Sequence, residues 1–213
     1  MTIKKIATTL LAVGLLTGAC SASPSGVGSP SEPTDGPPSG IPTGMWIAGD
    51  SIAYGVGMRL SAVGDFNIAQ GSTGYISRGV KAFNVPERIA LMRAAYGDPD
   101  TLLILAGGND LNNNHETVED VFEAASNLHN QLESEGIDVR FVTEPIPGNG
   151  TSHNVQGWTT GELDALNDLF IDTYPDTLDC GPAGHPTRGG NDVHPTELGY
   201  TALAECIYMQ IGV

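Results

Sequence analysis

Short apolar runs alternate with longer amphipathic segments along the chain from Met45 onward. Runs of a few apolar residues that end in Gly, Asp, Asn or Pro are typical of strands, whereas apolar residues three or four positions apart are typical of helices. The pattern predicts strands at residues 45–48, 66–69, 101–106 and 139–143, and helices at 51–63, 85–96, 117–135, 163–174 and 196–211.

This order of elements predicts an α/β domain in which helices cover both faces of a central parallel sheet. In such sheets, ligands bind at the carboxyl ends of the strands. We therefore expect the functional residues in the loops that follow the strands.

The first 44 residues have a composition unlike that of the domain. Residues 1–19 carry Lys4 and Lys5, an apolar run and then small residues, which is the pattern of a signal peptide. Residues 21–44 contain six Ser, six Pro and five Gly, a composition that cannot bury a core. We expect a signal peptide at 1–19, a tether at 20–44 and a folded domain at 45–213.

Residues 16–20, Leu-Thr-Gly-Ala-Cys, resemble the lipobox of bacterial lipoproteins, in which the cysteine becomes lipidated. Leu16 stands one position further from Cys20 than the family places it, so plain cleavage after Ala19 stays open. The expected location is the cell envelope, on the outer face of the cytoplasmic membrane through a lipid on Cys20, or otherwise outside the cell.

The chain is strongly acidic, with 25 Asp and Glu against 9 Lys and Arg and a formal charge of −16 among 213 residues. Removal of residues 1–19 takes away two lysines and no acid. A surface of this charge repels phosphate backbones and anionic lipid headgroups. We therefore expect no nucleic-acid partner, and membrane contact only through a lipid anchor.

Four loops in chain order carry the groups that acyl transfer requires. Ser51 follows the first predicted strand, Gly71 the second and Asn109 the third, and His194 comes near the end of the chain. A hydroxyl nucleophile, a small residue with an available N–H, a side-chain amide and a base are its usual parts. Each loop alone has a plainer explanation; Ser51, for example, can simply cap the helix that it begins.

In this order and spacing, the four blocks resemble the GDSL, or SGNH, hydrolase family over the whole predicted domain. The resemblance implies a three-layer, flavodoxin-like α/β/α fold and makes Ser51 the nucleophile. It implies an oxyanion hole formed by the N–H groups of Ser51 and Gly71 and the side-chain amide of Asn109. It makes His194, which precedes Pro195, the general base.

The residue that orients His194 departs from the family pattern. The family places an acid three residues before the histidine, where this chain has Asn191, and Asp192 follows it. A neutral amide stabilises an imidazolium less than a carboxylate does. Asn191, Asp192 and a backbone carbonyl all remain candidates.

The three cysteines fit an exported protein. A disulfide between Cys180 and Cys206 would leave Cys20 for lipidation. The bridge would close a loop around His194, for which chain-entropy arguments give about 3–4 kcal/mol of stabilisation.

We expect no cofactor and no metal. The segment from Asp110 begins like a calcium loop, but His115 replaces its required glycine. A glycine fingerprint from Gly55 lacks its third glycine, because Leu60 stands there. The histidines lack metal-ligand spacing, and His129, in the middle of a predicted helix, is expected at the surface.

The sequence thus predicts an exported serine esterase that acts on carboxylic esters, with short acyl or acetyl esters of glycans or small molecules favoured. Two alternatives stay open. One is an O-acyltransferase that uses the same acyl-enzyme, and the other is a non-catalytic glycan-binding module on the same fold.

Overall fold

The computed structural model describes residues 44–60, 66–79, 83–113, 115–146, 160–184 and 193–212. The predicted signal peptide, Cys20 and the tether lie outside these residues, except for Gly44, the last residue of the tether. So do Asn191 and Asp192. The predictions for all of them stay predictions. No helix in the described ranges is both long and apolar enough to cross a membrane.

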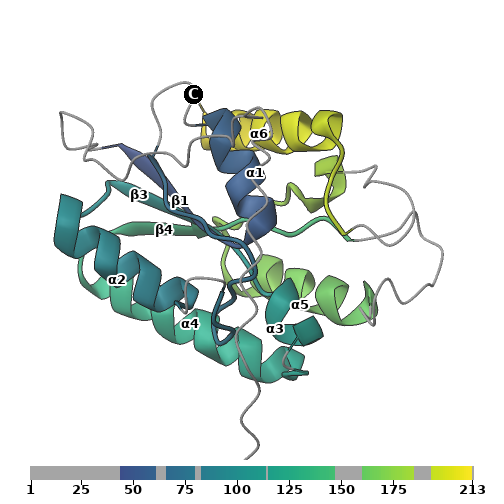
Figure 1. The fold of residues 1–213 in the computed structure, drawn as a ribbon, viewed down its shortest axis with the longest axis horizontal. Coiled ribbons are helices and arrows are strands. Elements are labelled where there is room, and N and C mark those ends of the chain that lie inside the picture. The colour runs from purple at the N-terminus through teal and green to yellow at the C-terminus, as the bar shows by residue number, and fades with distance from the viewer. Residues whose placement is uncertain are drawn as a thin grey trace, which may run out of the picture. The chain divides into compact units, whose positions relative to one another are not determined.

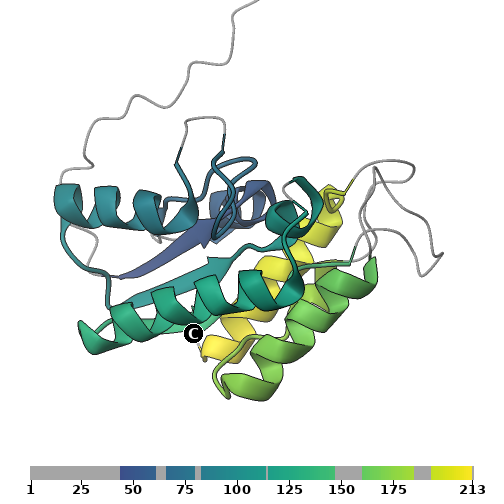
Figure 2. The same ribbon diagram turned by 90° about the horizontal axis from the view of Figure 1, so that it is seen from below.

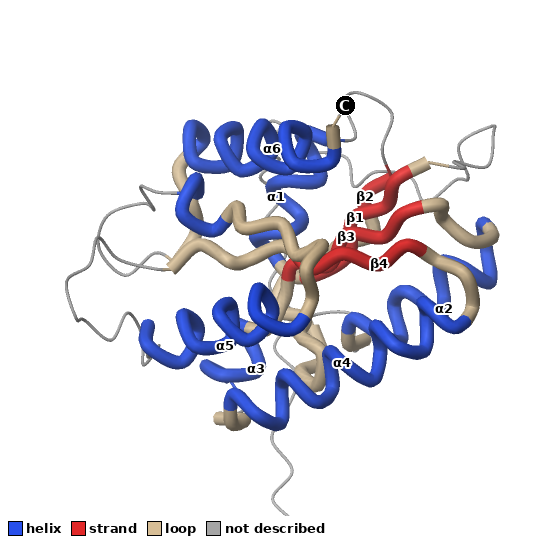
Figure 3. The backbone as a smooth tube through the Cα atoms, turned by 180° about the vertical axis from the view of Figure 1, so that it is seen from behind, coloured by secondary structure: helices blue, strands red, loops and turns tan. Residues whose placement is uncertain are grey.

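The described strands form one parallel sheet in the order β2-β1-β3-β4 (Figure 3). The strands are β1 (Met45–Gly49), β2 (Phe66–Asn67), β3 (Thr101–Leu105) and β4 (Asp138–Phe141). All four predicted strands are confirmed, although β2 and β4 each end two residues earlier than expected. Beyond β4, Leu178 pairs with Val142 through a single parallel bridge that the sequence did not predict.

The predicted helices are also present. They are α1 (Ser51–Leu60), α2 (Val85–Tyr96), α4 (Val118–Ser134), α5 (Thr160–Thr173) and α6 (Glu197–Ile211). Polar side chains begin several of them: Asn84 forms a capping box with Glu87 at α2, and Thr117 and Thr196 cap α4 and α6.

Alternating strand residues supply two separate cores, one on each face of the sheet. Trp46 and Ala48 point to the face covered by α2 and α4, whereas Ile47 points to the face covered by α1 and α6 (Figures 1 and 2). Helix α5 packs beside α4 on the first of these faces. The predicted three-layer α/β/α architecture is therefore confirmed.

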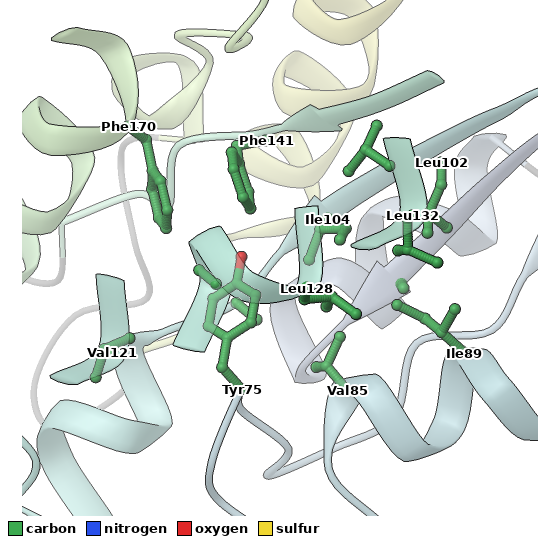
Figure 4. Packing of buried hydrophobic residues seen from close by; sticks show 14 of the residues in the cluster. Tyr75, Val85, Ile89, Leu102, Ile104, Val121, Leu128, Leu132, Phe141 and Phe170 are labelled. Carbon is green, nitrogen blue, oxygen red and sulfur yellow. The ribbon is translucent and has the colours of Figure 1, made fainter. Parts of the chain in front are cut away.

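An aromatic cluster fills the core between β4, α5 and the loop after β2 (Figure 4). The rings of Phe141 and Phe170 stack with centroids 4.3 Å apart, and the ring of Tyr75 lies 6.3 Å from each of them. The Tyr75 hydroxyl is buried and has no hydrogen-bond partner among the described residues. The loop after β2 is therefore anchored in the core by a large side chain.

Two local expectations were wrong. Residues 107–110 were expected to form the loop after the third strand, but a short helix, α3 (Gly108–Asn113), begins within them. The N–H groups of Asp110 and Leu111 both bind the Gly107 carbonyl. His129, expected at the surface, is partly buried, and its ring lies 4.3 Å from the ring of Tyr174. A mid-helix position does not by itself show which side of the helix faces the sheet.

Cys180 and Cys206 form the predicted disulfide, with Cα atoms 5.7 Å apart. The bond joins the residue before a short 3-10 helix, η2 (Gly181–Gly184), to the middle of α6. Helix α6 is thereby attached covalently to the segment that follows Leu178, the residue that pairs with Val142 beyond β4.

Gly49, at the end of β1, is a position that only glycine can occupy. Its φ is +141°, and a Cβ there would lie 1.8 Å from the Leu105 carbonyl oxygen. Gly97 also has a positive φ, +90°, but a Cβ there would meet nothing within 4 Å. Replacing Gly97 by alanine therefore tests backbone strain alone, whereas replacing Gly49 tests strain together with a steric clash.

We predict that Gly49→Ala lowers the free energy of unfolding by more than about 4 kcal/mol, because backbone strain and overlap add. Gly97→Ala should cost only about 1–3 kcal/mol, the cost of strain alone. Urea unfolding of both variants measures the difference. Equal losses of unfolding free energy in the two variants would contradict the prediction. They would show that β1 and β3 can move apart to accommodate a Cβ at little cost.

Candidate active site

The site begins at the turn from β1 into α1. The Asp50 N–H donates to the Leu105 carbonyl, 3.3 Å away, and ties this turn to β3. One carboxylate oxygen of Asp50 accepts the N–H groups of Ile52 and Ala53, at 2.7 and 3.3 Å. Asp50 is therefore the cap of α1, and the Ser51 hydroxyl is not used for that purpose.

The Ser51 hydroxyl instead lies beside His194. Its Oγ is 2.9 Å from Nε2 of the imidazole, although the two residues are 143 positions apart in the sequence. Both side chains are partly exposed, so a substrate can reach them from solvent. This is the geometry of a nucleophile and its base.

Helix α6 holds His194 in place. Gly55 of α1 packs so closely on the Tyr200 ring that a Cβ would lie 2.4 Å from it. Arg59 adds an ion pair with Glu197 and a hydrogen bond to the Gly55 carbonyl. Since α1 begins with Ser51 and α6 begins three residues after His194, the packing of these two helices helps to set the distance between the two residues.

The loop after β2 lies against the same turn. The Gln70 N–H donates to the Gly49 carbonyl at 2.9 Å, and the Thr73 hydroxyl lies 2.7 Å from that oxygen. Gly71, between them, has an N–H with no acceptor among the described residues, and a Cβ on it would face open space. The structure thus brings a free backbone donor beside the Ser51 turn.

Asn109 lies beside this turn as well, but its amide is engaged. Nδ2 is 3.0 Å from the Thr73 carbonyl and 3.2 Å from the second carboxylate oxygen of Asp50. These acceptors account for both of its hydrogens. The expected donation to an oxyanion would require one of these contacts to be exchanged, and it stays a prediction.

The carboxylate of Asp110 holds the loop after β2 in place. It accepts the N–H groups of Tyr75, Ile76 and Ser77 at 2.7, 3.1 and 2.6 Å. A Cβ on Gly74 would lie 2.3 Å from the same carboxylate, so that position must stay small. A carboxylate with three backbone donors holds a loop rigidly without any cation.

Buried acids dominate the electrostatics. Burial raises the pKa of Asp50 to about 6, against the lowering effect of the Ile52 and Ala53 hydrogen bonds and of a positive charge on His194. Burial also raises the pKa of Glu144 well above its usual value, and the charges of Asp50 and Asp110 add to this. The negative charge of an ionised Asp50 therefore disfavours ionisation of Glu144.

Sequence reasoning identified Ser51 and His194 but missed Asp50, Asp110 and Glu144. An aspartate directly before a helix is a capping signal, so the role of Asp50 was readable. The contacts of the other two span 33–36 positions, and no local pattern marks them. Within the described ranges, no three His, Cys, Asp or Glu side chains are grouped to hold a metal ion.

The architecture is shared with solved esterases. No family model and no curated protein matches the sequence. An aryl esterase of M. smegmatis in its inhibitor-bound form superposes with a TM-score of 0.64 at 15% identity, covering 79% of this chain and 98% of that one. A GDSL-like lipase from Bacteroides thetaiotaomicron gives 0.63 at 14%, covering 80% and 88%. The chain has the fold of the GDSL-like lipases and esterases.

A third structure of this GDSL-like fold is a carbohydrate acetylesterase family member from Sinorhizobium meliloti. It superposes with a TM-score of 0.60 at 14% identity and covers 80% of this chain and 100% of that one. These neighbours confirm the predicted fold.

The raised pKa of Asp50 makes the stability of the protein pH-dependent. The folded protein holds this proton more tightly than the unfolded chain, so the contribution is complete below about pH 4 and is lost as the pH rises through about 6. We predict that wild type loses about 3 kcal/mol relative to Asp50→Ser between pH 4 and 7. Serine keeps a capping oxygen but cannot ionise. Parallel pH curves from urea unfolding of the two proteins would contradict this prediction.

Proposed function

We propose that the protein is a serine esterase that hydrolyses carboxylic esters through an acyl-enzyme on Ser51. The observation that carries the proposal is the 2.9 Å contact between Ser51 Oγ and His194 Nε2, at the carboxyl edge of a GDSL-like fold. The nucleophile lies at a strand-to-helix turn. Its hydroxyl does not cap the helix, because the Asp50 side chain does so.

In the first half of the reaction, Ser51 Oγ attacks the ester carbonyl carbon and its proton passes to His194 Nε2. The developing oxyanion takes hydrogen bonds from the N–H groups of Ser51 and Gly71, and from Asn109 if its amide exchanges a contact. The tetrahedral intermediate collapses, and the proton on His194 passes to the leaving alcohol.

In the second half, His194 removes a proton from water, which attacks the acyl-enzyme carbonyl carbon. The bond from Ser51 Oγ to the acyl group then breaks, the proton on His194 passes to Ser51 Oγ, and the acid leaves. The imidazolium formed in each half is attracted by ionised Asp50, whose pKa a positive charge on His194 lowers. Asn191, Asp192 or a backbone carbonyl orients the ring from its other side.

The proposed substrates are short acyl or acetyl esters of glycans or small molecules, met outside the cytoplasm. The aromatic content of 6% supports this choice, because a long acyl channel needs a large apolar lining. A carbohydrate acetylesterase family member among the structural neighbours also supports it. The proposed location is the cell envelope, with a lipid on Cys20 as the anchor.

We predict that Ser51→Ala and His194→Ala each lower kcat on a chromogenic acetate ester by about 10⁴-fold or more. Ser134→Ala is the matched control, because Ser134 lies exposed in the last turn of α4, away from the site, and should leave turnover unchanged. Circular dichroism shows whether each variant is folded. Equal, weak turnover by wild type and a folded Ser51→Ala would refute the esterase proposal and favour a binding module.

The same assay ranks the candidates that orient His194, since Asn191→Ala and Asp192→Ala should differ in their loss of kcat. We expect the more damaging variant to also shift the acidic limb of the rate against pH.

Acyl-chain preference tests the substrate proposal. We predict that kcat/KM is at least about tenfold higher for the acetate than for the octanoate ester, with the palmitate ester lower still, since each poorly accommodated methylene loses binding energy. A preference for long chains would overturn this proposal but not the mechanism. Acylated acceptor in the product, when a glycan alcohol is added, would identify a transferase.

A further inference from the structure

Glu144, just beyond β4, is a buried acid whose backbone is fixed from two sides. It is 1% exposed. The side chain of Asn167 on α5 accepts its N–H at 3.0 Å and donates to its carbonyl at 2.9 Å. Gly181 lies against the same carbonyl, where a Cβ would be only 2.5 Å from the oxygen. The base of the Glu144 side chain therefore has little freedom to move.

The side chain reaches from there to the first residue of helix α3. Its Oε1 accepts the N–H of Gly108 at 3.0 Å. Gly107, with a φ of +137°, makes the turn that brings this N–H inward. Asn109 follows directly, and its amide lies on Asp50 and Thr73 beside Ser51. One hydrogen bond thus links Glu144 to helix α3, which carries the third predicted oxyanion donor, Asn109.

No cation accounts for the burial of this acid. Within the described part of the chain, Glu144 forms no ion pair with an arginine, and its second oxygen, Oε2, has no hydrogen-bond partner. Burial and the nearby acids Asp50 and Asp110 favour the neutral carboxyl. A neutral carboxyl keeps Oε1 as an acceptor, and so does an amide of the same length.

We infer that Glu144 is a positioning residue for acyl transfer, which holds Gly108 and thereby sets the side chain of Asn109 beside Ser51. The role depends on the reach of the side chain and on an acceptor oxygen, and not on negative charge. This inference rests on the esterase function proposed above.

Two substitutions separate reach from charge. Glu144→Gln keeps the length and the acceptor but cannot ionise, whereas Glu144→Asp keeps the acid but is one methylene shorter. The assay uses an acetate ester at a temperature below the unfolding transition of every variant. Under these conditions Glu144→Gln should stay within about threefold of wild type in kcat. Glu144→Asp should lose about 10–100-fold in kcat, with KM changed less than about threefold, because only part of an oxyanion contribution is lost.

A double-mutant cycle tests the route through Asn109. In the Asn109→Ala background, adding Glu144→Asp should lower kcat by less than about a further threefold, because the side chain that Glu144 positions is already gone. Leu132→Ala is the control for general destabilisation, since Leu132 is a buried core residue near the far end of α4. It should lower the unfolding midpoint but leave kcat unchanged.

Several outcomes would overturn the inference. One is a wild-type kcat for Glu144→Asp, and a second is an equal loss of kcat in Glu144→Gln and Glu144→Asp. A third is a double variant whose loss of kcat is the product of the losses caused by Glu144→Asp and Asn109→Ala alone. Full turnover by Ser51→Ala is a different result, because it would remove the esterase function itself. If Ser51→Ala is inactive while both Glu144 variants match wild type, the esterase proposal stands and only the role of Glu144 falls.

Discussion

The site depends on one carboxylate, that of Asp50, which accepts hydrogen bonds from two structural elements at once. One oxygen caps α1 through Ile52 and Ala53, and the other takes the amide of Asn109. Because an aspartate rather than the serine caps the helix, the Ser51 hydroxyl can point to His194. Without this carboxylate α1 would lose its cap, and Asn109 of α3 would lose its contact with the nucleophile turn.

Asp50, Asp110 and Glu144 share a mode of stabilisation that contrasts with an ordinary ion pair. In the described structure each is buried and accepts backbone N–H groups, and none forms a salt bridge. Backbone donors are fixed by the fold, so they hold the loops without the entropy cost of ordering a long cationic side chain. The arrangement also suits an acidic chain that has few basic residues.

The sequence predicted the layers and the outline of the site because both follow from local signals. Short apolar runs locate the strands, apolar residues three or four positions apart locate the helices, and the order of four loops points to Ser51 and His194. Helix α3 was missed because its residues, Gly-Asn-Asp-Leu-Asn-Asn, are mostly polar and turn-forming. The contact of Glu144 with Gly108 was also missed, since it exists only once β3 and β4 lie side by side.

The dependence of His194 on α6 has a consequence for the order in which the molecule matures. Ser51, the loop after β2 and Asn109 are synthesised before the base, which follows Ser51 by 143 positions. Helix α6 is then joined by a disulfide to Cys180. A nascent chain that folds from its N-terminus therefore holds a nucleophile before its base has been synthesised. A cut between Cys180 and His194 would not release the base, because the disulfide still joins α6 to Cys180.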